Sequence, residues 1–500
     1  MTPPPIADIH AHPSFLPWNA QENPSQLWTP HPPRWNQHRW KITTYAQSDF
    51  TTMARGNVRL LWTSLYPLER GFVPDARLLG SKRLLTRVGQ TLLRTSKERL
   101  RFFRSEDYDY FDSLQGEYEF FAAGENLAHD ISSNQGEEPW SYTIGRDIQH
   151  VNETLESPQR IAVVLTIEGA HAFGSVHPAR PPKTEDVLDR VDRVLGSWDH
   201  PVFCVTFCHH FQNALCGHAR SIYAPIHRIF DQSDGLDTGF TEMGRAVLDR
   251  ILDLDQKHRP DRIPTRIDLK HMSLAGRWEL YQRIEDHNRA HPDNPVPLLV
   301  SHFAASGNPK TIPDILASPH DSDQEYASTP GVFNPWTINF CDEEILRIHQ
   351  SGGLLGLILE QRILASKREL RRVRSVPEKK YGRPNPEFNR AWGELLLNHI
   401  RQVITVCRDA RKSWYTRDPQ SAWDLLALGT DYDGKINVTD AFPTSEQLPQ
   451  LERTLVELLD QAPDRDDLLL GLDPDRAARK IVFENTRSFL DRHFRTVPIR

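Results

Sequence analysis

The stretch Ala7-Asp8-Ile9-His10-Ala11-His12 lies close to the N-terminus and is typical of a short β-strand. Side chains two residues apart in a strand point to the same face, so His10 and His12 would place two imidazoles side by side. Asp8 shares that face and would orient one of these ligands or join them. The pair is a candidate for holding a divalent metal ion, although neighbouring histidines are more often ordinary surface residues. The interpretation therefore depends on the residues at the ends of the other strands.

Further apolar segments alternate with helical stretches along the chain. The segment Ile161-Ala162-Val163-Val164-Leu165-Thr166-Ile167 is nearly all apolar, which indicates a strand buried on both faces of a parallel sheet. Other strands are predicted at Val58–Tyr66, Val202–Phe207, Arg266–His271, Pro297–His302, Leu354–Leu359 and Leu426–Asp431. Eight strands separated by helices predict an α/β fold, a (β/α)8 TIM-type barrel with helical insertions. A doubly wound sheet is the competing fold, but it would not bring all the strand ends together.

Three segments interrupt this alternation, so we treat residues 1–500 as a single barrel with insertions near 68–150, 308–336 and 361–419. The first insertion has apolar residues at helical spacing, most clearly between Leu84 and Leu93. After the second, Asp342 is predicted as the N-cap of a helix. The third is rich in Lys and Arg. A solvated helix face explains that charge better than a nucleic-acid site, because the chain as a whole carries a net charge of −7.

The composition argues against several classes of protein. A hydrophobic share of 38 % and a charged share of 25 % are typical of a globular domain, and no apolar run has the length of a membrane span. The N-terminus has no signal-peptide pattern. The five cysteines show no disulfide spacing, and we expect Cys204 and Cys208 to be buried thiols. We therefore expect a cytoplasmic protein that binds neither nucleic acid nor membrane.

Acids and histidines stand at the ends of the predicted strands, namely at His10, Glu168, His209, His271, His302 and Asp431. In a TIM-type barrel these ends form one face, and catalysis takes place there. Glu168 is the candidate bridge between two ions because a carboxylate has two oxygens. The ligand pairs would be His10 with His12 and His271 with His302. A bridging water would lose its proton near neutral pH, and Asp431 would take or pass that proton.

Each of these residues also has an ordinary structural explanation. Glu168 and Asp431 could cap or form turns, and His271 and His302 could be hydrogen-bonded core residues. His209 and His210 are adjacent, and the alternation of a strand predicts that only one of them points inward. The coincidence of so many strand-end positions favours the metal site.

Six motifs succeed one another along the chain. They are Asp8-Ile9-His10-Ala11-His12, Ile167-Glu168-Gly169, Phe207-Cys208-His209, Asp268-Leu269-Lys270-His271-Met272-Ser273, Ser301-His302 and Gly429-Thr430-Asp431-Tyr432-Asp433-Gly434. In this order they resemble the membrane (renal-type) dipeptidases, peptidase family M19 of the amidohydrolase-like superfamily. The resemblance implies a binuclear barrel enzyme that cleaves dipeptides with two Zn²⁺ ions, for which other divalent cations could substitute.

The resemblance also implies a role for each residue. The metal ligands would be His10, His12, Glu168, His271 and His302. His209 would polarise the scissile carbonyl or bind the tetrahedral intermediate, and Asp431 would be the proton shuttle. Asn339 would contact the substrate.

Two positions depart from the family pattern. His12 stands where the family often has Asp, which leaves the site with one negative charge fewer. Ile338, just before Asn339, stands where the family usually has an Arg that grips the C-terminal carboxylate of the substrate. An aliphatic side chain cannot replace a bidentate guanidinium. Either another cation supplies the grip or the substrate lacks that carboxylate.

Three functions are therefore open at this point. The leading hypothesis is a binuclear zinc hydrolase acting on a dipeptide-like substrate, with homodimer formation left open. The second is the same barrel acting on another amide, a lactone or a phosphoester, which Ile338 favours. The third is a metal-bound, non-catalytic protein that recruits partners through the basic insertion at 361–419.

Overall fold

The computed structural model describes residues 4–31, 45–73, 95–131, 138–174, 182–223, 229–259, 261–318 and 331–496. Eight parallel strands form a nearly closed barrel, which confirms the predicted TIM-type fold and makes the doubly wound alternative wrong. In sheet order they are β1 (Ile6–Ala11), β2 (Val58–Leu65), β4 (Arg160–Glu168), β5 (Val202–Thr206), β6 (Arg266–Asp268), β7 (Leu299–Phe303), β8 (Leu354–Leu357) and β11 (Leu426–Leu428).

The first and last strands meet just beyond the end of β11. The backbone N–H of Asp431 donates to the carbonyl of His10 at 2.9 Å, and that of His12 donates to Tyr432 at 2.9 Å. These two bonds tie the ends of β1 and β11 together at the carboxyl face of the barrel. The first and last motifs of the sequence are thereby neighbours in space.

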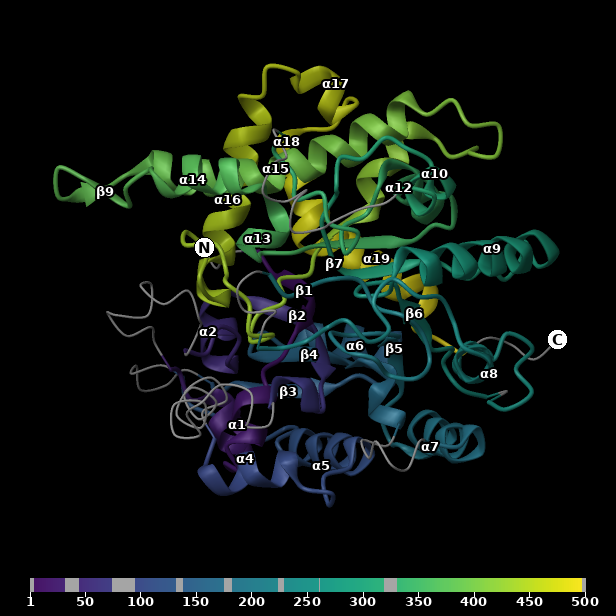
Figure 1. Ribbon diagram of the computed structural model, residues 1–500. Coiled ribbons are helices and arrows are strands. Elements are labelled where there is room, and N and C mark those ends of the chain that lie inside the picture. Colours follow the sequence, from purple (N-terminus) through teal and green to yellow (C-terminus); the bar gives the residue numbers. More distant parts are fainter. Residues whose placement is uncertain are drawn as a thin grey trace.

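Helices surround the strands (Figure 1). They are α1 (Phe15–Asn19), α2 (Phe50–Arg55), α4 (Lys97–Arg104), α5 (Tyr110–Ala123), α6 (Ile148–Glu156), α7 (Thr184–Ser197), α8 (Glu242–Leu252), α9 (Leu274–Ala290), α10 (Ile312–Leu316), α12 (Asp342–Gln350), α13 (Gln361–Leu364), α14 (Lys367–Arg374), α15 (Pro386–Asp409), α16 (Leu448–Asp460), α17 (Arg465–Leu469), α18 (Pro474–Arg479) and α19 (Asn485–His493). Thr241 and Ser273 cap α8 and α9 with their hydroxyl oxygens.

One local prediction about secondary structure is wrong, and one strand was not predicted. The N-cap of α12 is Cys341 rather than Asp342, because the Glu344 carboxylate accepts the Cys341 N–H at 2.9 Å and closes the first turn one residue earlier. A further strand, β3 (Ser141–Ile144), pairs in parallel with β4 outside the barrel path. It has only four residues and no continuous apolar run, so its sequence gives little sign of it.

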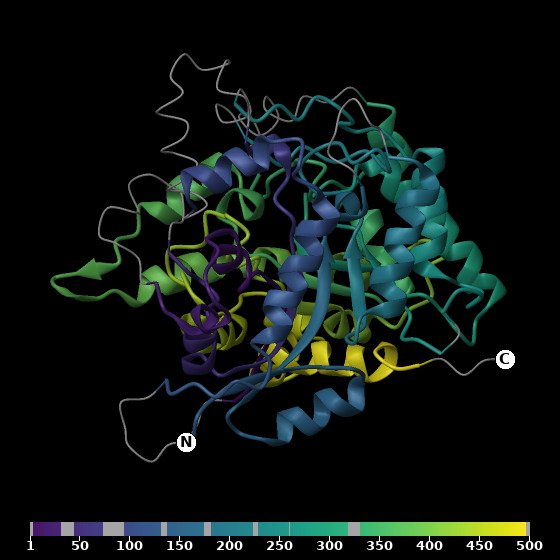
Figure 2. The same ribbon diagram turned by 90° about the horizontal axis from the view of Figure 1, so that it is seen from below.

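The C-terminal helices cross the amino ends of the strands. Between α18 and α19 the chain makes a π-helical turn, Lys480–Glu484, that packs on β1 and β11. Arg479 donates to the carbonyl of Pro5, which precedes β1, and Phe494 packs edge-on against Phe203 of β5. Figure 2 shows these helices, in yellow, at one end of the strands. The opposite end is left to the loops after the strands, which form the catalytic face of a barrel.

The insertion at 361–419 is mainly helical. It contains α13, α14, a hairpin of β9 (Lys379–Lys380) and β10 (Arg383–Pro384), and α15, and the hairpin projects from the body of the molecule (Figure 1). In α14 the apolar residues Leu370 and Val373 are buried, whereas most of its basic residues are exposed. This confirms the predicted solvated helix face. The helix predicted between Leu84 and Leu93 lies outside the described residues, and the division into one unit with three insertions stays a prediction.

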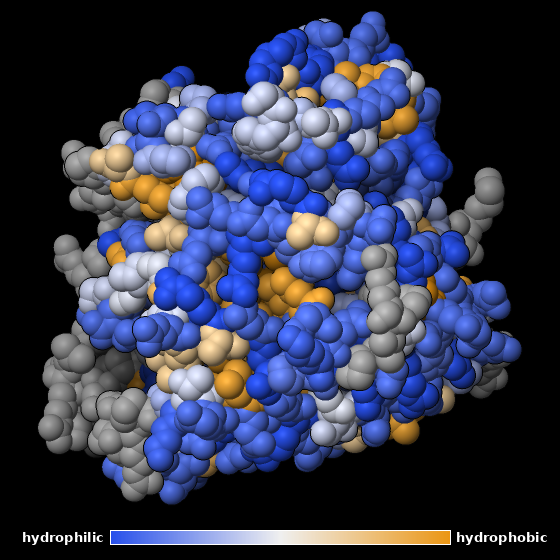
Figure 3. Space-filling view, turned by 90° about the vertical axis from the view of Figure 1, so that its right-hand side faces the viewer, coloured by the Kyte–Doolittle hydropathy of each residue, from blue (hydrophilic) through white to orange (hydrophobic). Residues whose placement is uncertain are grey.

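On the face in Figure 3 hydrophilic side chains predominate and hydrophobic ones appear as separate patches. All five cysteines are buried and free, as predicted for Cys204 and Cys208. Among the described residues no helix combines the length and the apolar character needed to cross a bilayer.

Candidate metal centre

The predicted strand-end residues come together in the structure. They are His10, His12, Glu168, His209, His271, His302 and Asp431, and none is more than 7 % exposed. They lie on β1, β4 and β7 and on the segments that follow β1, β5, β6 and β11, so their proximity is a consequence of the barrel. Glu168, the last residue of β4, lies at the centre of the group. The structure therefore brings the predicted residues together, and their roles in binding metal or in catalysis stay predictions.

One half of the cluster is formed by His10, His12 and Asp431 around Glu168. The Nε2 atoms of His10 and His12 lie 3.2 Å from Oε1 and Oε2 of Glu168 respectively, and 3.2 Å from each other. Asp431 Oδ1 lies 3.7 Å from both Nε2 atoms. One ligand atom from each of the four residues lies within 4.8 Å of all the others. We call this group the carboxylate-rich half.

The other half is formed by His271 and His302, which approach the same Glu168 oxygen as His10, and the ring of His302 stacks on that of His10 at 4.2 Å. The Nε2 atoms of His271 and His302 are 3.0 Å apart and lie 3.7 and 3.8 Å from Glu168 Oε1. Oε1 is thus close to histidines of both pairs, as expected of a bridging carboxylate. We call this group the imidazole half.

Hydrogen bonds fix which ring nitrogen faces the centre. Nδ1 of His12 lies 2.9 Å from the Ser64 carbonyl, and Nδ1 of His10 lies 3.1 Å from the Ser64 hydroxyl. Nδ1 of His302 lies 2.7 Å from the Ser301 hydroxyl, which in turn donates to Asp268 at 2.6 Å. Because Nδ1 is occupied in all three rings, Nε2 is available as a ligand atom.

Asp8 orients the cluster and is not part of it. Its carboxylate accepts the backbone N–H and the hydroxyl of Thr430, at 3.0 and 2.6 Å, and the backbone N–H of His10 at 3.1 Å. These bonds lock β1 to the segment that carries Asp431. The sequence left two roles open for Asp8, namely to orient a metal ligand or to be one. These hydrogen bonds favour the orienting role.

The turns that carry the cluster contain left-handed backbone. His271 has φ +64° and Asp431 has φ +63°, a conformation uncommon for residues other than glycine and frequent at functional sites. Asp433, also at φ +64°, accepts the backbone N–H groups of Gln47 and Ser48 at 3.0 and 2.8 Å. Asp433 therefore has the ordinary turn-forming role, whereas Asp431 faces the histidines.

The residues present fit divalent metal ions. Oε1 of Glu168 is buried and has no hydrogen-bond partner among the described residues, although the Nε2 atoms of three histidines lie 3.2 to 3.8 Å from it. Two imidazole nitrogens 3.0 to 3.2 Å apart beside a carboxylate have the spacing of neighbouring ligands of one ion. Neutral imidazoles and carboxylates are the ligands that zinc and similar ions take in hydrolases. A shared cation on each side of Glu168 would satisfy every one of these atoms.

The electrostatics of the two halves differ. Burial alone would lower the pKa of His12, but the carboxylates of Glu168 and Asp431 raise it to about 10. Burial holds the pKa of His271 and of His302 well below the usual value, so these imidazoles are neutral. Burial acts to raise the pKa of Glu168, yet His209, His10 and His12 bring it well below its ordinary value. The carboxylate at the centre is therefore ionised.

Glu69 belongs to the site and was not among the predicted residues. Its Oε2 lies 2.6 Å from Nδ1 of His209, and its Oε1 accepts the backbone N–H of Phe211 at 2.9 Å. Burial opposes ionisation of Glu69, but His209 brings its pKa down to about 2. The carboxylate directs Nε2 of His209 toward Glu168, 3.4 Å away. A sign in the sequence was available, since Glu69 is an acid only four residues after the second strand.

The prediction that only one of His209 and His210 points inward is wrong. Both rings lie beside that of His271, with ring centroids 4.6 and 5.0 Å from it. Strand β5 ends at Thr206, so the two histidines lie on a loop where the alternation of a strand no longer applies. His210 is therefore a second residue that the sequence analysis missed.

The segment around Asn339 has a structural role. The Asn339 amide donates to the carbonyls of Asn334 and Ile363, at 3.0 and 2.8 Å. Ile338 is only 1 % exposed and lies in the apolar core. The predicted substrate contact of Asn339 stays a prediction, and Ile338 supplies no charge to the site.

Two buried basic side chains, Lys270 and Arg277, flank His271 in the sequence. Arg277 is committed to the framework, because it pairs with Glu344 at 2.7 Å and donates to the Thr337 carbonyl at 2.7 Å. Lys270 is also buried, and its ammonium has no hydrogen-bond partner among the described residues. Burial lowers the pKa of Lys270 to about 7. Lys270 is the better candidate for a cation that could receive an anionic group.

Two known proteins of similar fold are metallopeptidases. A metallopeptidase from Rhodobacter sphaeroides, bound to a phosphinate mimic of the dipeptide L-Ala-D-Ala, superimposes with a TM-score of 0.54 and 15 % identity over 99 % of this chain and 100 % of its own. The dipeptidase AC, a metallopeptidase of family M19, gives a TM-score of 0.50 and 16 % identity over 98 % of each chain. No family model and no curated protein matches the sequence. At these identities the comparison establishes the fold, and this chain has the fold of the M19 metallopeptidases.

Proposed function

We propose that the protein is a metal-dependent hydrolase of the M19 dipeptidase type, with two Zn²⁺ or similar divalent ions and a small dipeptide-like substrate. One observation carries the proposal: the Glu168 carboxylate lies between two pairs of buried imidazoles, with Oε1 close to both. The shared fold of two metallopeptidases supports it. When bound, the ions would polarise the scissile carbonyl and make a water between them acidic.

The side chains of this protein would divide the remaining work. His10, His12, His271 and His302 would hold the ions, with Glu168 shared between them. Asp431 Oδ1, 3.7 Å from the Nε2 atoms of the first pair, would accept a proton from the attacking water and deliver it to the leaving amine. His209, held by Glu69 at 2.6 Å, would donate a hydrogen bond to the oxygen that becomes negative during attack.

A second candidate substrate class is favoured by Ile338. Its side chain is apolar and buried, so it cannot bind a C-terminal carboxylate. The same centre would then act on an amide, lactone or phosphoester without that carboxylate. Lys270 is the alternative source of a positive charge, which would retain recognition of a free C-terminus.

The test compares dipeptides with free and with amidated C-termini, including Xaa–D-Ala substrates, on zinc-loaded protein. Hydrolysis of the panel, absent from protein stripped with a chelator, is the expected result. Equal kcat/KM for both forms would mean that the carboxylate is not recognised. A preference for the free form that disappears in Lys270→Met would assign the recognition to Lys270.

Failure of every dipeptide despite two bound ions per chain would contradict the dipeptidase proposal. The same sample would then be assayed on lactones and phosphodiesters. Turnover of either class would keep the hydrolase and replace its substrate. No turnover on any panel member would favour the non-catalytic alternative.

A further inference from the structure

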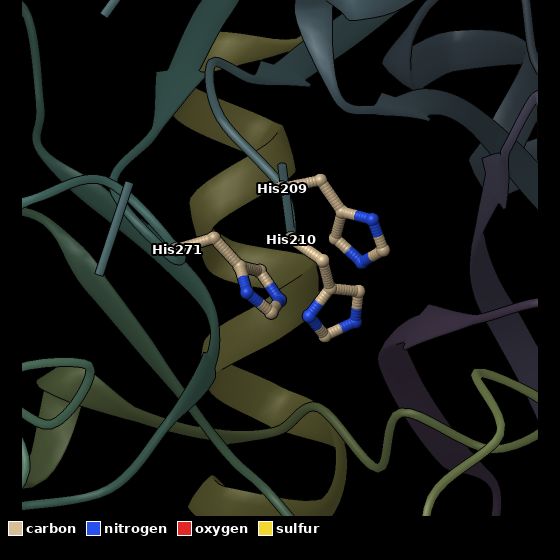
Figure 4. A group of neighbouring side chains, drawn as sticks. All are labelled: His209, His210 and His271. Carbon is tan, nitrogen blue, oxygen red and sulfur yellow. The ribbon is translucent and has the colours of Figure 1, made fainter. Parts of the chain in front are cut away.

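A second group of imidazoles lies beside the Glu168 cluster. His209 and His210, on the loop after β5, converge with His271, on the loop after β6 (Figure 4). One ligand nitrogen from each ring lies within 4.8 Å of the other two. At a metal–nitrogen distance of about 2.1 Å, ligands on opposite sides of one ion are about 4.2 Å apart, so small side-chain rotations would bring all three nitrogens onto one ion.

His210 is oriented in the way that metal-bound histidines are. Its Nδ1 lies 2.5 Å from the hydroxyl of Ser221. The amide of Gln232 donates to that hydroxyl at 2.8 Å and to the carbonyl of His210 at 2.6 Å. One ring nitrogen is thus held by a built hydrogen-bond network, and Nε2 is left as the ligand atom.

The other two rings also have a nitrogen to offer. Nδ1 of His209 is held by Glu69 at 2.6 Å, so Nε2 either carries a proton and donates to the oxyanion, as proposed above, or loses that proton and binds an ion. In His271 the Nε2 atom faces His302, whereas Nδ1 is buried and has no hydrogen-bond partner among the described residues. A buried polar atom without a partner in the middle of an imidazole group is the second observation that points to a ligand.

We propose that His209, His210 and His271 form a further cation position next to the carboxylate-bridged centre. No carboxylate belongs to this set, and imidazole ligands suit Ni²⁺, Cu²⁺ and Zn²⁺ better than Mn²⁺ or Mg²⁺. The position is therefore selective for imidazole-preferring ions. The inference rests on the proposed metal centre through the shared His271, which would release its ring proton to solvent when both of its nitrogens bind ions. It goes beyond that centre because no role assigned above uses His210.

The experiment titrates metal-free, full-length protein with Ni²⁺ and with Mn²⁺ in a calorimeter, for the wild type and for His210→Asn. We expect the weakest Ni²⁺ site of the wild type to be lost or weakened at least tenfold in the variant, with Mn²⁺ binding unchanged within twofold. His218→Asn is the matched control. His218 is a buried histidine of the same segment, and its ring nitrogens lie 3.2 and 3.1 Å from the carbonyls of Ala219 and Asp234.

Ser221→Ala keeps the imidazole and removes only the hydroxyl that orients it. It is expected to weaken the same Ni²⁺ site about tenfold, the usual effect of losing such a partner, and it decides the matter if His210→Asn fails to fold. Ni²⁺ binding unchanged in both variants overturns the inference. Equal losses of Ni²⁺ and Mn²⁺ also overturn it, because His210 would then act only through the loop. If the wild type binds neither ion, both the proposed metal centre and this inference are contradicted. If Mn²⁺ binding is normal and Ni²⁺ binding is the same in the wild type and the variants, only this inference is contradicted.

Discussion

The two halves of the proposed metal centre share Glu168 but differ in the number of carboxylates and in the protonation of their imidazoles. The carboxylate-rich half has Asp431 beside two imidazoles, and there the pKa of His12 is raised to about 10. The imidazole half has only Glu168 as an acid, and burial keeps His271 and His302 neutral. An ion entering the first half must displace a proton, whereas the second half is ready to bind. Negative charge and the capacity to move protons are thus concentrated on one side of the centre.

The largest effect is expected from Glu168→Gln, which removes the carboxylate that the two halves share. The amide is neutral, and its NH₂ would face an imidazole nitrogen in place of a carboxylate oxygen. We expect hydrolysis to fall at least about a thousandfold and metal content to fall below one ion per chain. Elemental analysis after desalting, together with the dipeptide assay, measures both. A variant that keeps two tightly bound ions would show that the halves do not depend on Glu168.

Asp431→Asn tests whether the acid of the carboxylate-rich half moves protons or holds metal. Asn tolerates the φ of +63° at this position, so the turn is retained. Loss of the proton acceptor is expected to lower kcat by a factor of about 10² to 10⁴ with two ions still bound. Asp431→Ala serves as the comparison, since it removes the polar group altogether. Loss of an ion in parallel with activity would instead make Asp431 a ligand.

Ser301→Ala and Ser64→Ala compare the supports of the two halves. Ser301 links His302 to Asp268, at 2.7 and 2.6 Å, so its loss releases a ring of the imidazole half. We expect the ion of that half to bind about 10 to 100 times more weakly, with the other ion unchanged. Ser64→Ala should instead weaken the binding of the ion in the carboxylate-rich half. The loss should be smaller, because His12 keeps its bond to the Ser64 carbonyl. Stepwise calorimetric titration with Zn²⁺ separates the two ions, and equal losses from both variants would contradict the division into halves.

Much of this arrangement could be predicted from the sequence, because the carboxyl ends of successive barrel strands meet at one face. Eight apolar segments indicated the fold class, and an acid or histidine after six of them indicated the cluster around Glu168. Two residues that lie further along the loops could not be predicted in the same way. His210 depends on where β5 ends, and Glu69 reaches His209 from the loop after β2. Loop conformations are set by tertiary contacts such as these, and no periodicity in the sequence records them.

The smallest predicted effect is on stability and concerns Glu117, a residue outside the proposed metal centre that supports only its carboxylate-rich half. The loop after β1 in the carboxylate-rich half depends on Glu117 of α5, which is fully buried. Its carboxyl group accepts the Ser14 hydroxyl at 2.7 Å and the Tyr66 N–H at 2.9 Å. Burial raises the pKa of Glu117 from 4.5 to about 7. The folded protein therefore holds a proton here that the unfolded chain has lost above pH 4.5.

Because the folded pKa of Glu117 is the higher one, its contribution to stability is greatest below pH 4.5 and is lost as the pH rises to 7. The difference corresponds to about 3 kcal/mol. Glu117→Gln can donate to Ser14 and accept from Tyr66 without ionising. We therefore expect its Tm, measured in a chelator, to gain a few degrees relative to the wild type between pH 5 and pH 7.5. A Tm difference between the two proteins that stays constant over this range would mean that Glu117 ionises in the fold without cost, and that the support of the carboxylate-rich half does not respond to pH.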